Sequence, residues 1–116
     1  MRNARGKATI FHVKRHLYVR TDLFVPGVGA LINIAHLEEI DDAQCTLRRM
    51  IEMNGEEAIM GAAVDGQTVG AINKPNETVP HPDTYDQFPD ITATYLEADE
   101  FDALWTETVA KFPELC

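Results

Sequence analysis

The fold is decided by residues 58–72, AIMGAAVDGQTVGAI, in which two short apolar runs flank the pair Asp65-Gly66. This pair between such runs is typical of a type I′ turn, because both turn residues adopt a positive φ, which aspartate and glycine tolerate. We therefore predict an antiparallel hairpin of residues 58–64 and 67–72. A two-residue turn also determines the register, so each facing pair can be named. The predicted pairs are Val64 with Gln67, Ala62 with Val69, Gly61 with Gly70, and Ile59 with Ile72.

Four further stretches have the composition of strands. Residues 8–20 alternate at period two, and the apolar residues of one face are Phe11, Val13, Leu17 and Val19. Arg15 interrupts that face, which indicates either a bulge or a short hairpin. Residues 23–25 form a second candidate strand that ends at the turn pair Pro26-Gly27. Residues 30–37 suit a buried strand or a helical turn, and residues 91–97 form the last candidate strand.

Two segments have the spacing of amphipathic helices. Residues 42–54 begin beside the capping residues Asp41 and Asp42 and end at Asn54-Gly55. Apolar and small residues follow at intervals of three and four along this segment, namely Ala43, Leu47, Met50 and Ile51. The second helix begins at Asp99 or Glu100 and ends at Phe112, before Pro113. Its predicted buried stripe consists of Phe101, Leu104, Trp105, Thr108, Val109 and Phe112.

These elements predict an α+β fold. We expect a mostly antiparallel sheet of about five strands, with a central helix and a C-terminal amphipathic helix packed on one face. Residues 7–116 are expected to form a single α+β domain, and residues 1–6 a flexible basic tail. Residues 73–90 hold four of the six prolines and are predicted to be a long Pro-rich loop. Tyr85 and Phe88 in this loop are expected to anchor it to the body or to a partner.

Composition and charge constrain the setting of the chain. The 116 residues carry a net charge of −9, and 45% of them are hydrophobic. Six of the ten basic residues lie among the first twenty, without an acid, so that residues 21–116 carry −15. No long apolar run follows the basic first residues, and two cysteines are too few for a disulfide scaffold. We therefore expect a cytoplasmic protein without membrane contact, for which nucleic-acid binding is disfavoured by charge.

Cys45 is the residue with the clearest chemical hypothesis. In a helix of residues 42–54 it would lie in the first turn, where the helix dipole stabilises a thiolate. Arg48 and Arg49 would follow at the next turn and add positive charge. The sequence thus predicts either a reactive thiol at Cys45 or a buried structural cysteine, and it contains no Cys-x-x-Cys partner for redox exchange.

Ligand or partner contacts are predicted at a few further positions. Gly61 and Gly70 would leave a notch in the sheet, filled by a ligand or by an aromatic side chain such as Trp105 or Phe101. Tyr18, His36, Tyr85 and Trp105 are candidates for the lining of a pocket, and Phe88 for a partner contact. His12 and His16 would lie too far apart on a strand to share an ion, so we predict no metal and no cofactor.

Three function classes follow. The first is a non-catalytic accessory or interaction protein that forms a homodimer, because both faces of the 58–72 hairpin are apolar and two short helices cover one face only. The second is a small-molecule-binding pocket protein or small enzyme, which requires a sheet that encloses an apolar cavity. The third is an acidic inhibitor that occupies a basic site on a protein partner, and it depends on the charge of residues 21–116.

Overall fold

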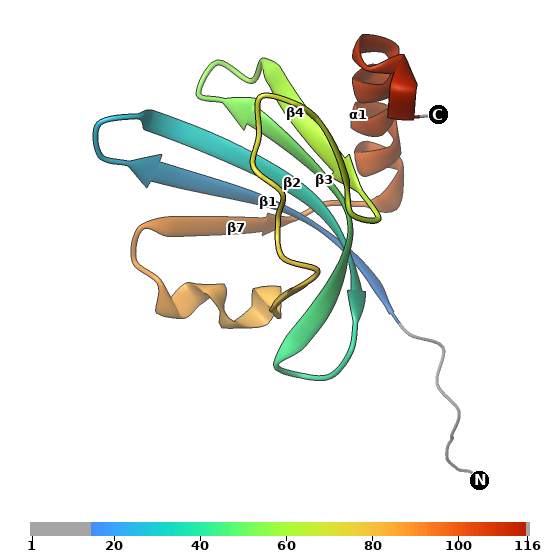
Figure 1. The fold of residues 1–116 in the computed structure, drawn as a ribbon. Coiled ribbons are helices and arrows are strands. Elements are labelled where there is room, and N and C mark those ends of the chain that lie inside the picture. Colours follow the sequence, from blue (N-terminus) through green and yellow to red (C-terminus); the bar gives the residue numbers. More distant parts are fainter. Residues whose placement is uncertain (1–14, 116) are drawn as a thin grey trace, which may run out of the picture.

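The computed structural model describes residues 15–115, which form a seven-stranded antiparallel sheet and one C-terminal α-helix (Figure 1). The strands of the sheet follow the order β5-β4-β3-β2-β1-β7, and β6 pairs with the first three residues of β3. The strand bounds are β1 His16–Val25, β2 Gly29–Glu39, β3 Gln44–Asn54, β4 Ile59–Val64, β5 Gln67–Gly70, β6 Thr78–Pro80 and β7 Ile91–Tyr95. The helices are η1 Pro82–Gln87, α1 Ala98–Lys111 and η2 Pro113–Leu115.

The hairpin of β4 and β5 has the predicted turn and register. Asp65 and Gly66 have φ angles of 47° and 88°, as a type I′ turn requires. Val64 lies opposite Gln67 and Gly61 opposite Gly70. The pairing ends there, because β5 stops at Gly70, so the predicted pair of Ile59 and Ile72 is wrong.

The predicted central helix of residues 42–54 is wrong, because these residues form β3. A β-bulge explains the error. Leu37 pairs with Leu47 and His36 with Arg49, so Arg48 is an extra residue in the strand. It moves Leu47 and Met50, which lie on one face of the sheet, to a helix-like spacing of three. The Asp41 carboxylate accepts N–H bonds from Ala43 and Gln44, as a helix cap would, but here it closes a turn into a strand.

The other strands are longer or simpler than predicted. Residues 16–25 form one strand, so 23–25 is not a separate element, and residues 30–37 lie within β2. Phe11 and Val13 lie outside the described residues. Gly27, with a φ of 83°, forms the predicted turn between β1 and β2. The Pro-rich segment 73–90 contains β6 and η1.

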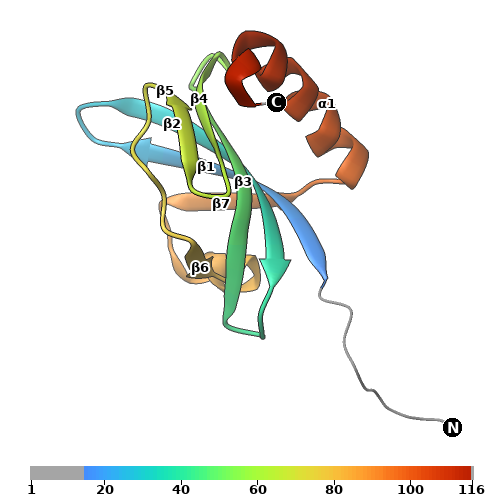
Figure 2. The ribbon, with the colours of Figure 1, turned by 45° about the vertical axis from the view of Figure 1, so that its right-hand side comes forward.

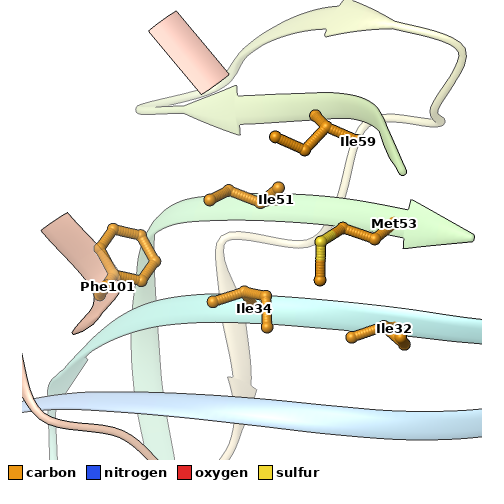
Figure 3. Packing of buried hydrophobic residues seen from close by; sticks show 6 residues of the cluster. All are labelled: Ile32, Ile34, Ile51, Met53, Ile59 and Phe101. Carbon is orange, nitrogen blue, oxygen red and sulfur yellow. The ribbon is translucent and has the colours of Figure 1, made fainter. Parts of the chain in front are cut away.

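Helix α1 packs on one face of the sheet and closes the main core. Six buried side chains from three strands and the helix form this core (Figure 3), namely Ile32, Ile34, Ile51, Met53, Ile59 and Phe101. Lys111 Nζ donates to the Ile59 carbonyl over 2.8 Å and ties the end of α1 to β4. Trp105 is half-buried rather than fully in the core, and its ring stacks on that of Phe101 at 6.0 Å.

The opposite face of the sheet is crossed by residues 71–90, which we call the covering segment (Figure 2). The sheet is therefore covered by a helix on one side and by an irregular segment on the other. This arrangement explains why both faces of β4 are apolar, since Ala62 and Ala63 are both buried although they point to opposite faces. No helix within residues 15–115 is long and apolar enough to cross a membrane.

Candidate ligand pocket

A mostly apolar hollow lies between the sheet and the covering segment. Its floor consists of alternate residues from the three long strands, because successive side chains of a strand point to opposite faces. They are Val19, Thr21 and Leu23 of β1, Asn33, Ala35 and Leu37 of β2, and Leu47 and Met50 of β3. The floor is thus mostly aliphatic, with one hydroxyl and one amide.

The roof of the pocket comes from the covering segment and the start of β7. Its residues are Pro75, Val79, Pro80, Tyr85, Phe88 and Ile91. Proline has no N–H to donate to a strand ladder, so the segment pairs with the sheet only at the short strand β6 and otherwise lies over it. The volume of this partly open pocket is about 320 Å³, which is at the lower end of the usual range for sites that hold a small molecule.

His81 attaches the covering segment to the sheet. The Asp83 N–H donates to His81 Nδ1 over 3.1 Å, so the neutral ring carries its proton on Nε2. Nε2 then donates to Glu39 Oε2, 2.7 Å away at the end of β2. His81 is buried, and Glu39 also accepts from Arg15. Hydrogen bonds from Arg15 and then His81 lower the pKa of the Glu39 carboxyl. The attachment is therefore a charge-assisted hydrogen bond.

Two polar groups lie side by side on the pocket face of the sheet. Asn33, in the floor, faces Glu52, just beyond the floor, across β2 and β3. Asn33 Oδ1 is buried, and no donor from residues 15–115 reaches it. Glu52 is half-buried, and burial raises the pKa of its carboxyl. The Glu52 carboxylate thus remains an acceptor that the described residues do not use.

Two aromatic residues of the covering segment line the pocket. Tyr85 and Phe88 both face the pocket, and the Tyr85 hydroxyl donates to the Pro80 carbonyl over 3.1 Å. Phe88 remains 47% exposed, so its ring lies at the rim of the pocket. The structure therefore places these two residues against the body of the domain. Whether they also contact a ligand stays a prediction.

Tyr18 and His36 lie on the other face, beneath α1, and do not reach the pocket. The His36 ring stacks on Tyr18 at 4.8 Å, and its Nδ1 accepts from Arg49 Nε over 3.0 Å. The neutral ring therefore carries its proton on Nε2, which donates to His16 Nδ1 over 2.8 Å. Burial, followed by the nearby Arg49 charge, lowers the pKa of His36 to about 4.

Arg49 packs against the cluster of Tyr18, His36 and His16 beneath α1. Its guanidinium lies 4.7 Å from the centre of the Phe101 ring and 5.3 Å from that of Trp105. A cation in this position disfavours a metal ion beside His36. Among residues 15–115, no three His, Cys, Asp or Glu side chains are placed to hold a metal. The cluster therefore joins α1 to the sheet.

The glycine pair is filled by aliphatic and aromatic side chains other than the expected ones. A Cβ built on Gly61 would lie 2.7 Å from Ile72 Cγ2, and one on Gly70 would lie 3.0 Å from Phe112 Cζ. Backbone atoms come closer still, because the Gly61 Cβ would lie 2.6 Å from the Val69 carbonyl oxygen and the Gly70 Cβ would meet the Met60 carbonyl oxygen. The close approach of the hairpin backbones therefore requires glycine, and the nearest side chains are those of Ile72 and Phe112.

The structure removes the physical basis of the reactive-thiol hypothesis. Cys45 lies in β3, so no helix dipole acts on it. It is fully buried beside Val19 and Leu37, and burial, followed by the charge of Glu39, raises the pKa of the thiol to about 11. Both changes disfavour the thiolate. The geometry is that of the alternative reading, a structural cysteine.

Sequence analysis missed Asn33, Glu52 and Thr21. Once β3 is taken for a helix, Asn33 and Glu52 no longer appear to share a face. A usable signal was present in β2, where the alternation Leu31-Asn33-Ala35-Leu37 places a single polar side chain in an apolar row.

Comparison of the chain with protein-family models, with curated proteins and with solved structures finds no match.

Proposed function

We propose that this chain is a small-molecule-binding protein whose ligand lies between the sheet and the covering segment. One observation carries the proposal: a mostly apolar pocket of about 320 Å³ with the buried Asn33 amide in its floor. Binding sites for small ligands are typically concave and apolar, with a few polar groups that orient the ligand. Of the three function classes that the sequence suggested, the geometry supports the small-molecule-binding pocket protein best.

The chemistry of the lining supports binding more than catalysis. The polar groups around the pocket are the Thr21 hydroxyl, the Asn33 amide and the Tyr85 phenol. Such groups orient a ligand by hydrogen bonds. Burial raises the pKa of Tyr85, which keeps its hydroxyl protonated at neutral pH. Because that proton is donated to the Pro80 carbonyl, the oxygen is available to accept from a ligand. Apolar burial against Leu37 and Met50 would then supply most of the affinity.

The test uses N-phenylnaphthylamine, a neutral dye that fluoresces in apolar sites. We expect saturable binding, with amide chemical-shift changes concentrated at Ala35, Met50 and Phe88. The variant Ala35→Trp fills the floor of the pocket and is expected to abolish dye binding. The matched control is Ala103→Trp on the exposed side of α1, which is expected to bind the dye like the parent.

Two results would contradict the proposed function. The first is equal dye binding by folded Ala35→Trp and by the parent chain. The second, which needs no variant, is a set of shift changes on the parent chain that lies outside the pocket.

The homodimer remains a prediction with a weaker argument. It depended on a hairpin face without an intramolecular cover, whereas within residues 15–115 both faces of β4 are covered. Light scattering at micromolar concentration measures the oligomeric state directly. No geometric feature of the described residues favours the acidic-inhibitor hypothesis over the pocket.

A further inference from the structure

The apolar pocket continues into a second, more polar hollow. The two hollows share Asn33 and Met50 on the floor and Pro75 on the roof. Beyond Pro75 the second hollow is lined by Glu52 and Lys74, among others, and has a volume of about 540 Å³. A ligand that extends under Pro75 would therefore pass from an aliphatic surface to a charged one.

Glu52 supplies the carboxylate of the second hollow. Within the described chain, no Lys, Arg or His nitrogen lies within 4.0 Å of its carboxylate, although Lys74 lines the same hollow. Lys74 itself is exposed to solvent. A half-buried carboxylate without a cation is costly, and a cation that binds beside it offsets that cost.

Asn33 lies beside Glu52 and leaves the carboxylate as the accessible acceptor. It faces Glu52 across the two strands, and its Oδ1 has no donor among residues 15–115 but is covered by protein atoms. The half-buried Glu52 carboxylate therefore selects a group that donates hydrogen bonds and carries a positive charge. A protonated amine donates up to three hydrogen bonds and brings the positive charge that is missing beside the Glu52 carboxylate. A hydroxyl group donates only one hydrogen bond and carries no charge.

We propose that the ligand of this pocket is an apolar molecule with a protonated amine, bound so that its apolar part lies under Tyr85 and its ammonium group contacts the Glu52 carboxylate beside Asn33. This inference rests on the proposed function and specifies the class of ligand. Phe88 at the rim and Pro75 between the hollows would enclose the apolar part.

The experiment compares three probes with the same tail, namely octylammonium, octanol and octanoate. Each probe competes with N-phenylnaphthylamine for the full chain at neutral pH. We expect octylammonium to bind about tenfold more tightly than octanol, as a charge-assisted hydrogen bond in a half-buried site provides, and octanoate to bind most weakly. The variant Glu52→Gln is expected to remove most of the difference between octylammonium and octanol.

A charge-matched control separates Glu52 from the general negative charge of the protein. Glu56→Gln removes the same charge at an exposed position and is expected to leave the preference for octylammonium unchanged. If the two variants behave alike, the proposed role of Glu52 is wrong.

The probe experiment has three further outcomes. If octanoate binds best and Lys74→Gln weakens octanoate binding, the ligand is an anion and the inference is overturned. If the dye binds in the pocket and none of the probes displaces it, the ligand class is wrong while the proposed function stands. If the dye does not bind, the proposed function itself fails.

Discussion

At the scale of single residues, His36 has the most strongly perturbed environment among the histidines of residues 15–115. Its Nδ1 accepts from Arg49 Nε, so a second proton on the ring would replace this hydrogen bond with a contact between two cations. The ring is also half-buried between Tyr18 and Phe101. The folded protein therefore holds His36 neutral, with a pKa of about 4.

This environment predicts a loss of stability in mild acid. The unfolded chain binds a proton at His36 near pH 6.5, whereas the folded chain does so only near pH 4. Stability from this group is thus fully present above pH 6.5 and is lost as the pH falls towards 4. Between pH 7 and pH 5 we expect His36→Gln to lose about 1 kcal/mol less free energy of unfolding than the parent chain, with allowance for partial exposure.

Urea unfolding at the two pH values measures this difference. An equal acid loss in His36→Gln and in the parent chain would show that His36 is not the group responsible.

At the scale of elements, the covering segment depends on a few side-chain attachments rather than on a long strand ladder. The paired part is the short strand β6 at the end of β3. His81 adds its two ring hydrogen bonds, to the Asp83 amide and to Glu39. A segment attached in this way is expected to open locally before the sheet unfolds.

We predict that His81→Ala loosens the covering segment without unfolding the sheet. Loss of a buried, charge-assisted hydrogen bond is expected to cost about 2 kcal/mol of stability. Hydrogen exchange should accelerate at the Thr84 and Phe88 amides, which donate to the His81 and Tyr85 carbonyls, while the amides of β2 stay protected. In a double-mutant cycle with Glu39→Gln we expect a coupling of about 1 kcal/mol or more. Additive effects of the two substitutions would mean that the contact does not hold the segment.

At the scale of the whole molecule, the sheet is covered on two sides by different kinds of structure. Helix α1 supplies the fully buried Phe101 to the main core, whereas the covering segment leaves a hollow. The stability of the domain is therefore concentrated on the helix side, because that side removes more apolar surface from water. The pocket lies on the other side, where the packing is looser.

This difference predicts how the chain responds to truncation. A chain that ends at Glu97 lacks α1 and exposes Ile34 and Ile51 to water, so we expect it to lose cooperative unfolding in urea. A chain that ends at Phe112 keeps the helix and the contact of Phe112 with the core, and is expected to unfold like the parent chain. A cooperative transition at the parent midpoint in the shorter chain would place the main source of stability elsewhere.

Local chemistry in the sequence was sufficient for the elements that depend on neighbouring residues. The Asp65-Gly66 pair determines both the turn and the register of β4 and β5, because few residues tolerate two positive φ angles in succession. The helix of residues 98–111 was also predictable, since its acidic first turn, apolar stripe and following proline act within a few residues. The strand at residues 91–95 was likewise predictable from its local sequence.

Tertiary structure alone decided β3 and the pocket. Residues 44–54 have apolar side chains on both faces because α1 covers one face and residues 71–90 cover the other, and the bulge at Arg48 disrupts the period of two. A local pattern cannot distinguish such a strand from a helix, because the evidence lies in partners that are distant in the chain. By contrast, the sequence by itself determined the turns, the terminal helix and the composition of the covering segment, because these features depend on residues that are neighbours in the chain. The pairing of β2 with β3 brought Asn33 and Glu52 to one face, and the packing of the covering segment placed Tyr85 over that face.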